Sequence, residues 1–161
     1  QANAFLESDE PHKIHGALLV VDADHFKSVN DRFGHHIGDV ALKQIAARIQ
    51  AEVGEGDFVG RLGGEEFGVM LPGADRNRAE AVAEGIRKTV QSIEFEVEGH
   101  CFNLSVSIGG AVFEQKVKYS QLFRFADQSL YRVKNSGRNS VDLVPFAAGH
   151  QEPESEHRKA G

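Results

Sequence analysis

Apolar positions follow two different spacings along the chain, and their order predicts a domain that mixes strands and helices. Residues 16–21 form a continuous apolar run, which is typical of a central strand covered on both faces. Three later segments repeat apolar residues every three to four positions, which predicts amphipathic helices. The predicted helices cover residues 39–53, 76–90 and 119–135, and the predicted strands cover 16–21, 94–97, 102–112 and 141–144, with a hairpin over 58–71.

Polar residues mark the ends and faces of these elements. Asp75 precedes the second helix as a side-chain cap, and Gly137 is expected to close the third. In the strand over 102–112, apolar residues at 104, 106 and 108 alternate with polar ones, which predicts one buried face. The order strand, helix, hairpin, helix, two strands, helix, strand favours an α+β fold of the ferredoxin-like, split βαβ type over a parallel βαβ series.

Composition narrows the class of protein. The 161 residues suffice for one domain with a sizeable core, and the net charge of −6 argues against a nucleic acid partner held by a broad basic face. Cys101 is the single cysteine, which fits a reducing compartment, so we expect a cytoplasmic location. No run approaches the roughly 18 apolar residues of a membrane span. Residues 147–161 are polar and aperiodic, and we expect a disordered tail.

Carboxylates gather at two strand ends. Asp22 and Asp24 directly follow the apolar strand, and Glu65 and Glu66 stand at the tip of the hairpin. Two glycines before Glu65, Gly63 and Gly64, supply the positive φ angles of a sharp turn. Carboxylates that converge from two strand ends predict a site for a divalent metal ion.

A late basic pair, Lys134 and Arg138, has two readings. Cations of this kind hold phosphate oxygens, which would complete a nucleoside triphosphate site beside metal-binding carboxylates. Taken alone, the pair is better explained as charge that complements the dipole at a helix C-terminus. The chain has no P-loop, no zinc-type Cys and His spacing and no nucleophile elbow.

Three histidines, His25, His35 and His36, cluster in sequence and raise the question of a transition metal. We favour simpler roles. His25 is expected in a turn that contacts phosphate, His35 in a structural role and His36 on the surface.

Four motifs follow one another along the chain: the run from Asp22 to Asp39, Gly-Gly-Glu-Glu-Phe at 63–67, Ser-Ile-Gly at 107–109 and the run from Ala126 to Asn139. In this order they resemble the GGDEF domain, the catalytic domain of diguanylate cyclases, with residues 63–67 as the Glu variant of its signature. The resemblance covers roughly residues 16–143, and we assign residues 1–146 to this domain.

The resemblance implies a fold and a reaction. Domains of this family have a central, mostly antiparallel sheet surrounded by helices, similar to polymerase palms and class III adenylyl cyclases. Each binds one GTP, and two copies face each other so that each 3′-hydroxyl attacks the α-phosphate of the other GTP. The products are cyclic di-GMP, a second messenger, and two pyrophosphates. The implied cofactor is Mg²⁺ (or Mn²⁺), two ions per active site, and the implied partner is a second copy of the domain.

The resemblance also implies roles for single residues. Asp22, Glu65 and the backbone carbonyl of Ala23 would hold the metals. Glu66 would lie beside the metal and the attacking hydroxyl, and Lys27 joins the catalytic set. Lys134 and Arg138 would bind the terminal phosphates, together with the backbone amides of His25 and Phe26. Gly63 and Gly64 are also expected to bind the substrate.

Asn30 and Asp39 would read the guanine edge. A carboxylate accepts hydrogen bonds from N1–H and N2–H₂ of guanine, which adenine does not offer, so we expect strict use of GTP. The alternatives are that Asp39 merely caps the helix that it opens, or that it does both.

The chain departs from the family at two places. Where many cyclases carry the Arg-x-x-Asp site for inhibition by product, this chain has Gly54 and Asp57. Glycine neither stacks on guanine nor grips phosphate, so we predict that this inhibition is absent. The family's opening segment is also missing, and the chain starts inside what reads as a helix at residues 4–6, so we expect a longer protein with a sensory domain.

One rival function remains open at this stage. A catalytically silent domain of this family would bind GTP or cyclic di-GMP as a regulatory module. Damage in the Gly-Gly-Glu-Glu-Phe motif usually marks such members, and here the motif at 63–67 is intact. A polymerase palm fits neither the size nor the charge of the chain.

Overall fold

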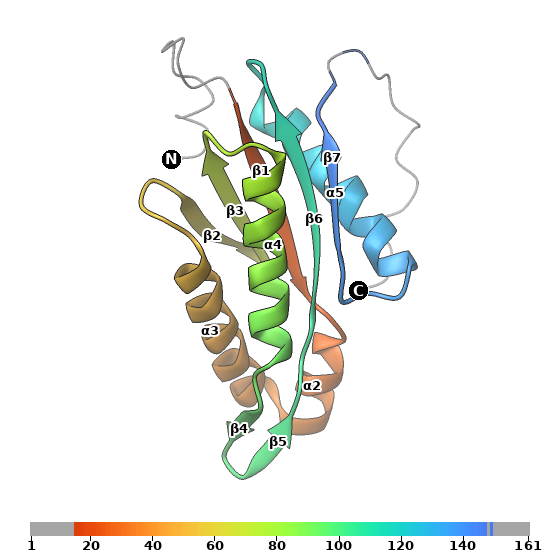
Figure 1. The fold of residues 1–161 in the computed structure, drawn as a ribbon. Coiled ribbons are helices and arrows are strands. Elements are labelled where there is room, and N and C mark those ends of the chain that lie inside the picture. The colour runs from red at the N-terminus through yellow and green to blue at the C-terminus, as the bar shows by residue number, and fades with distance from the viewer. Residues whose placement is uncertain (1–14, 148, 150–161) are drawn as a thin grey trace.

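A five-stranded sheet forms the centre of the molecule (Figure 1). The structure is a computed structural model that describes residues 15–147 and 149. The strands of the five-stranded sheet lie in the order β2-β3-β1-β6-β7, and a separate two-stranded sheet pairs β4 with β5. The elements are β1 (Gly16–Ala23), α2 (Phe26–Phe33), α3 (His35–Glu52), β2 (Phe58–Gly63), β3 (Glu66–Pro72), α4 (Arg76–Gln91), β4 (Phe95–Val97), β5 (His100–Phe102), β6 (Val106–Phe113), α5 (Tyr119–Asn135) and β7 (Val141–Pro145).

The sheet is mostly antiparallel, as predicted. β1 lies between β3 and β6 and pairs antiparallel with both, and β2 pairs antiparallel with β3. Only β7 runs parallel to its neighbour, β6. The α+β fold class expected from the order of elements is therefore confirmed.

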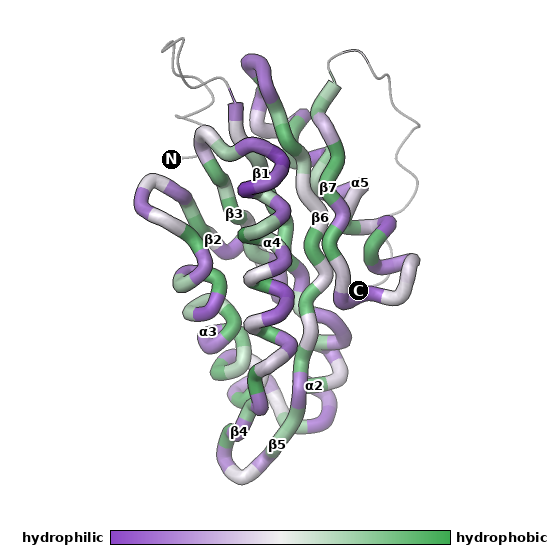
Figure 2. Tube along the Cα trace, in the orientation of Figure 1, coloured by the Kyte–Doolittle hydropathy of each residue, from purple (hydrophilic) through white to green (hydrophobic). Residues whose placement is uncertain are grey.

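Helices cover both faces of the sheet. Alternate residues of β1 point to opposite sides, and since all of them are apolar up to Val21, both faces need to be covered. Ala17, Leu19 and Val21 belong to one core, with residues of α3 and α4. Leu18 and Val20 belong to a second core, with residues of α5. Figure 2 shows the result as hydrophobic colour along the central strands and hydrophilic colour in the connecting turns.

Gly109 sets the distance between α5 and the sheet. A Cβ at this position of β6 would overlap backbone atoms of Ala126 and Leu130 in α5. Backbone atoms of a packed helix cannot move aside singly, so only glycine lets the helix approach this closely. Since α5 carries Lys134, this contact helps to position one of the basic residues.

Most predicted elements are confirmed, with small shifts of their ends, and the structure differs from the prediction at two places. The strand expected over 102–112 is divided into β5 and β6, and β6 is buried on both faces, since Ser107 is fully buried. The second difference is α2, a helix that the sequence pattern did not predict. Only Phe26 and Val29 are buried in it, too few to give a detectable period.

Asp75 caps α4 as predicted, since its carboxylate accepts a hydrogen bond from the Arg78 amide at 2.8 Å. Gly137 follows the C-cap of α5 with a φ of 109°, as expected of a closing glycine. Within the described residues, no helix is long and apolar enough to cross a membrane. The helix expected at residues 4–6 and most of the predicted tail lie outside the described part of the chain.

Candidate active site

The hairpin tip meets the end of β1, as the sequence predicted. Asp22 pairs with Glu66 across β1 and β3, and the Ala23 amide donates a hydrogen bond to the Glu65 carbonyl at 3.2 Å. The turn is sharp because Gly63 and Gly64 have φ angles of 151° and 49°. Its guanidinium neighbour, Arg61, donates to the Gly64 carbonyl at 2.9 and 2.6 Å, which fixes the turn.

Asp22 is a buried carboxylate with one cationic partner. It is 5% exposed, and Lys134 Nζ donates to its Oδ2 at 3.0 Å. Burial raises the pKa of Asp22 from 3.8 to about 6, although the bond and charge of Lys134 lower it, and the nearby charges of Glu65 and Glu66 raise it further. Lys134 therefore neutralises only part of the negative charge of these three carboxylates. Its ion pair with Asp22 explains the position of Lys134 better than a helix-dipole role alone.

Asp24 has a different part from Asp22, although both come from the same acidic run. Its two carboxylate oxygens accept hydrogen bonds from Ser107 Oγ and Ser105 Oγ, each at 2.6 Å, and from the Asn139 amide at 3.0 Å. With 2% exposure and these three donors, Asp24 is a structural anchor and not a free metal ligand. The sequence grouped Asp24 with the metal-binding acids, and no local signal marked its serine partners, which are 81 and 83 residues away.

The first turn of α2 follows directly on the end of β1. His25 precedes the helix with a left-handed φ of 53° and is exposed, whereas Phe26 is buried. Lys27 is exposed and makes no hydrogen bond with the described residues. Three residues separate Asp22 from the first backbone amide of α2, and the amides at this end of the helix are available to an anion.

Asn30 and Asp39 lie at the junction of α2 and α3. The side chain of Asn30 is half-buried against Gly38, the residue before Asp39. Asp39 is exposed and lies inside α3, whose N-cap is Gly34. The alternative that Asp39 caps this helix is therefore wrong, and its carboxylate makes no hydrogen bond or ion pair with the residues that the structure describes.

The histidines do not gather around a common point. His36 is exposed and its Nε2 lies 3.1 Å from Glu98 Oε1, and His35 is also exposed. In the part of the chain that the structure describes, no three His, Cys, Asp or Glu side chains are close enough to form a metal centre by themselves. The donors that fit a metal are Asp22 and Glu65, hard oxygen ligands of the kind that Mg²⁺ takes in ones or twos, with phosphate and water completing its shell.

Arg138 stands out among the basic residues of this region. Its backbone has a φ of 64°, and its amide donates to the Val133 carbonyl at 3.0 Å. The guanidinium makes no hydrogen bond or ion pair with the residues that the structure describes. It is thus an unpaired cation four residues beyond Lys134, which binds Asp22.

At the position of the Arg-x-x-Asp motif the aspartate is already engaged. Asp57 accepts a hydrogen bond from the Gly54 amide at 2.8 Å and another from Arg78 Nη2 at 2.6 Å. Its side chain is only 2% exposed. This carboxylate serves the link between the α3–β2 loop and α4.

A family model described as diguanylate cyclase, GGDEF domain, matches residues 2–140. Among curated proteins, the probable diguanylate cyclase DgcT of Escherichia coli (strain K12) is 35% identical over 147 residues, 88% of this chain and 32% of DgcT. The chain spans between 20% and 38% of the length of such curated relatives.

Solved structures agree with this match. The GGDEF domain of YfiN (or TpbB) from Pseudomonas aeruginosa has a TM-score of 0.82 and 33% identity, covering 91% of this chain and 92% of that domain. A domain described as the active GGEEF domain of a diguanylate cyclase from Vibrio cholerae has a TM-score of 0.75 and 29% identity, covering 83% of this chain and 85% of that one. The second structure carries the same Glu variant of the signature as residues 63–67 here.

Proposed function

The chain belongs to the GGDEF family, and on that premise we propose that it is a diguanylate cyclase domain that joins two GTP molecules into cyclic di-GMP. The observation that carries this proposal is the meeting of the hairpin tip with the end of β1, where the charges of Glu65 and Glu66 act on Asp22 and Lys134 forms an ion pair with Asp22. A cluster of three acids with one cation suits a substrate that arrives with metal ions. The similarity to an active GGEEF domain supports the intact catalytic function.

Asp22 and Glu65 would hold the metal ions, with the backbone carbonyl of Ala23 as a further ligand. The buried Asp22 carboxylate, whose pKa is raised to about 6 by burial, would gain a stronger partner than Lys134 in a divalent ion. Two ions, Mg²⁺ or Mn²⁺, would neutralise phosphate charge and favour ionisation of the attacking hydroxyl. Lys134 would then be released from Asp22 toward the phosphates.

The reaction needs two copies of the domain, because one copy binds one GTP and offers half of the site. The 3′-oxygen of each GTP forms a bond to the α-phosphorus of the other, the bond to the β-phosphate oxygen breaks, and pyrophosphate leaves. The 3′-proton goes to a base near the hydroxyl, and Glu66, beside the Asp22 strand, is the candidate. Lys27 is exposed at the start of α2, where its ammonium group would stabilise negative charge that develops on the phosphates.

The phosphates would bind where backbone donors and cations surround the acids. The amides of His25 and Phe26 begin α2, and the turn of Gly63 and Gly64 lets a ligand approach the backbone without meeting a side chain. Lys134 and Arg138 would bind the terminal phosphates, Lys134 through the single charge of its ammonium group and Arg138 through the paired N–H donors of its guanidinium. Only Arg138 of these two is without a partner among the described residues.

Asn30 and Asp39 would select guanine at the α2–α3 junction. The exposed Asp39 carboxylate accepts hydrogen bonds from N1–H and N2–H₂, whereas adenine would leave it unpaired. Sites built on such hydrogen bonds reject analogues that lack the donor groups. We therefore propose a strict preference for GTP over ATP.

Inhibition by product at the Arg-x-x-Asp position is proposed to be absent. Gly54 provides no guanidinium, and the Asp57 carboxylate is occupied by Arg78 and is almost fully buried. Addition of cyclic di-GMP should leave the initial rate unchanged.

Product analysis with GTP and Mg²⁺ tests the function. The domain would be assayed alone at high concentration and fused to a constitutive dimeriser, with Glu65→Ala and Glu66→Ala as controls. Cyclic di-GMP from the unaltered domain and not from the controls is the expected result. No product from the dimerised domain, with GTP still bound, would overturn it and leave a regulatory module that binds GTP or cyclic di-GMP.

A further inference from the structure

Three successive residues after α5 have left-handed backbone angles. Gly137, Arg138 and Asn139 have φ values of 109°, 64° and 45°. Glycine adopts this region freely, but other residues lose roughly 1–2 kcal/mol in it, and asparagine less than most. A conformation of this kind persists where surrounding contacts enforce it, so the contacts of this loop are informative.

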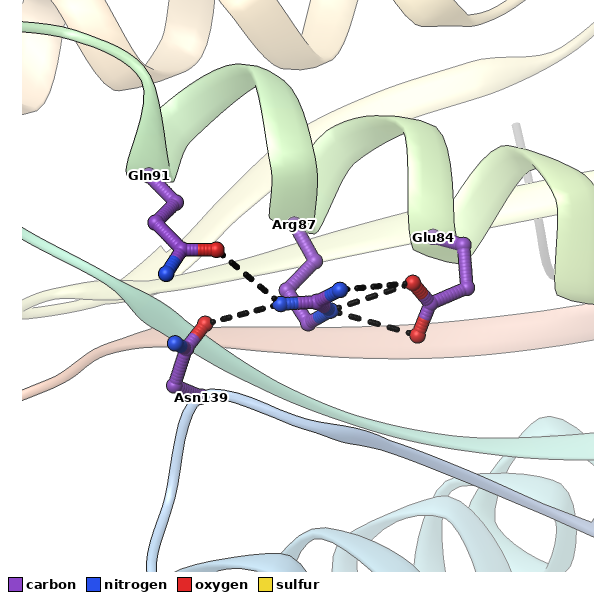
Figure 3. A network of polar contacts seen from close by, with 4 residues as sticks. All are labelled: Glu84, Arg87, Gln91 and Asn139. Carbon is purple, nitrogen blue, oxygen red and sulfur yellow. Dashed lines mark hydrogen bonds and ion pairs between the residues drawn. The ribbon is translucent and has the colours of Figure 1, made fainter.

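Asn139 joins this loop to two other parts of the fold. The Asn139 amide donates to Asp24 Oδ2 at 3.0 Å, and its side-chain Oδ1 accepts from Arg87 Nη1 at 3.2 Å (Figure 3). Asp24 is itself fixed at the end of β1 by Ser105 and Ser107. The loop is thus tied both to the strand that carries Asp22 and to α4.

Contacts within α4 hold the Arg87 guanidinium in place. Its guanidinium makes a two-pronged ion pair with Glu84, 2.9 Å at the closest, and Nη1 also donates to Gln91 at 3.2 Å (Figure 3). The Arg87 side chain is 17% exposed, so little solvent screens it. Glu84 and Gln91 orient Arg87 from its own helix, and Asn139 is the contact that reaches outside α4.

The residue directly before Asn139 is Arg138, whose side chain has no partner among the described residues. We propose that Asp24, Asn139 and Arg87 are positioning residues that hold Arg138 in place for the terminal phosphates of the bound nucleoside triphosphate. The proposal rests on the proposed function, since it assumes a triphosphate beside Asp22. The left-handed backbone at Arg138 costs free energy, although its side chain makes no hydrogen bond or ion pair with the described residues. A phosphate held by that side chain would explain why this conformation is kept.

Removing a positioning residue should weaken binding of a nucleoside triphosphate and leave binding of a nucleoside monophosphate unchanged. We would measure, by calorimetry with Mg²⁺, the affinity of the domain for the α,β-methylene analogue of GTP, which cannot be cleaved between the α- and β-phosphates, and for GMP. Arg87→Met and Asn139→Gly are the test variants. The glycine at 139 keeps the left-handed backbone accessible and removes only the side-chain acceptor. Gln91→Ala is the matched control, because it removes a bond of equal length to Arg87 that does not reach the loop.

Both test variants should bind the triphosphate analogue about three- to tenfold more weakly, with GMP affinity unchanged, as expected for one lost charge-assisted hydrogen bond. Combined with Arg138→Ala, neither should weaken binding further. The exchange rate of the Asn139 amide in the unliganded domain should rise in Arg87→Met and not in Gln91→Ala. Equal losses for both ligands, additive losses with Arg138→Ala, or an unchanged exchange rate would overturn the positioning role. Failure of the unaltered domain to bind the triphosphate analogue would instead overturn the proposed function.

Discussion

The Oδ1 atom of Asn30 lies so close to Gly38 that a Cβ at position 38 would overlap it. The ring of Phe26 limits the same space, since its Cζ would lie 3.1 Å from that Cβ. A glycine inside a helix lowers stability by about 1 kcal/mol relative to alanine, so its presence in α3 has to be explained by this contact. The absence of a Cβ at Gly38 thereby leaves room for the Asn30 side chain against α3, one residue before Asp39.

Gly38→Ala is therefore expected to displace Asn30 and weaken binding of GTP by about tenfold, the value of roughly one hydrogen bond. The free energy of unfolding should change little, because the helical preference of alanine offsets part of the clash. The measurement is calorimetric affinity for GTP beside a denaturant titration. Gly60→Ala, at a position where a Cβ meets nothing within 4 Å, serves as control and should leave both quantities unchanged. Unaltered GTP affinity in Gly38→Ala would refute the role given to Asn30.

Gly109→Ala should destabilise the fold and not only the site. The added Cβ would overlap the backbone of α5 at Ala126 and Leu130, so the helix must shift as a body. We expect the free energy of unfolding to fall by about 3 kcal/mol. Urea titration of this variant beside Gly60→Ala would check it, and a loss equal to that of the control would contradict the packing described for α5.

The ion pair of Arg78 with Asp57 should matter more than that of Arg132 with Asp142. Arg78→Met leaves the Asp57 carboxylate, 2% exposed, with the Gly54 amide as its remaining donor. A loss of about 2 kcal/mol in unfolding free energy is expected. Arg132→Met breaks a pair whose side chains are 52% and 38% exposed, and it should change stability by less than about 0.5 kcal/mol. Equal effects in denaturant titrations would contradict this ranking.

Asp22 gives the stability of the metal-free domain a specific pH dependence. Because burial raises its pKa from 3.8 to about 6, the folded domain binds a proton at Asp22 more tightly than the unfolded chain does. Its contribution to stability is therefore fully present below pH 3.8 and is lost as the pH rises through about 6. Replacing Asp22 by asparagine removes this loss.

Asp22→Asn, measured in EDTA, should raise the free energy of unfolding at pH 7.5 by on the order of 1–2 kcal/mol, and the gain should shrink toward pH 5. Denaturant titrations of both proteins at the two pH values give the difference, in which the other titrating groups cancel. A gain that is the same at both pH values, or a loss at pH 7.5, would show that Asp22 is not destabilised by burial.

Local spacing predicted the elements well where a period extends over many residues. The helix of residues 119–135 has the predicted ends, and α3 differs from the prediction only in beginning at His35 instead of Asp39 and ending at Glu52 instead of Val53. The eight residues of α2 bury just Phe26 and Val29, so no period was visible there. Burial of Ser107 depends on α5 covering the second face of β6, a contact that alternation within the strand does not encode.

The acidic cluster was predictable because strand ends and a hairpin tip meet by topology. What Asp24 does was not, since its partners Ser105, Ser107 and Asn139 are 81, 83 and 115 residues away. The bond from Arg87 to Asn139 likewise spans 52 residues. Such partners become visible only when the packing of the sheet and its helices is known.

The most direct test of a cyclase site built from two copies is the initial rate of cyclic di-GMP formation against the concentration of the unfused domain, at saturating GTP and Mg²⁺. The rate per domain should rise with concentration until most domains are paired, and cyclic di-GMP added at the start should not lower it. A rate per domain that does not depend on concentration, or no product at any concentration while GTP is bound, would contradict this account.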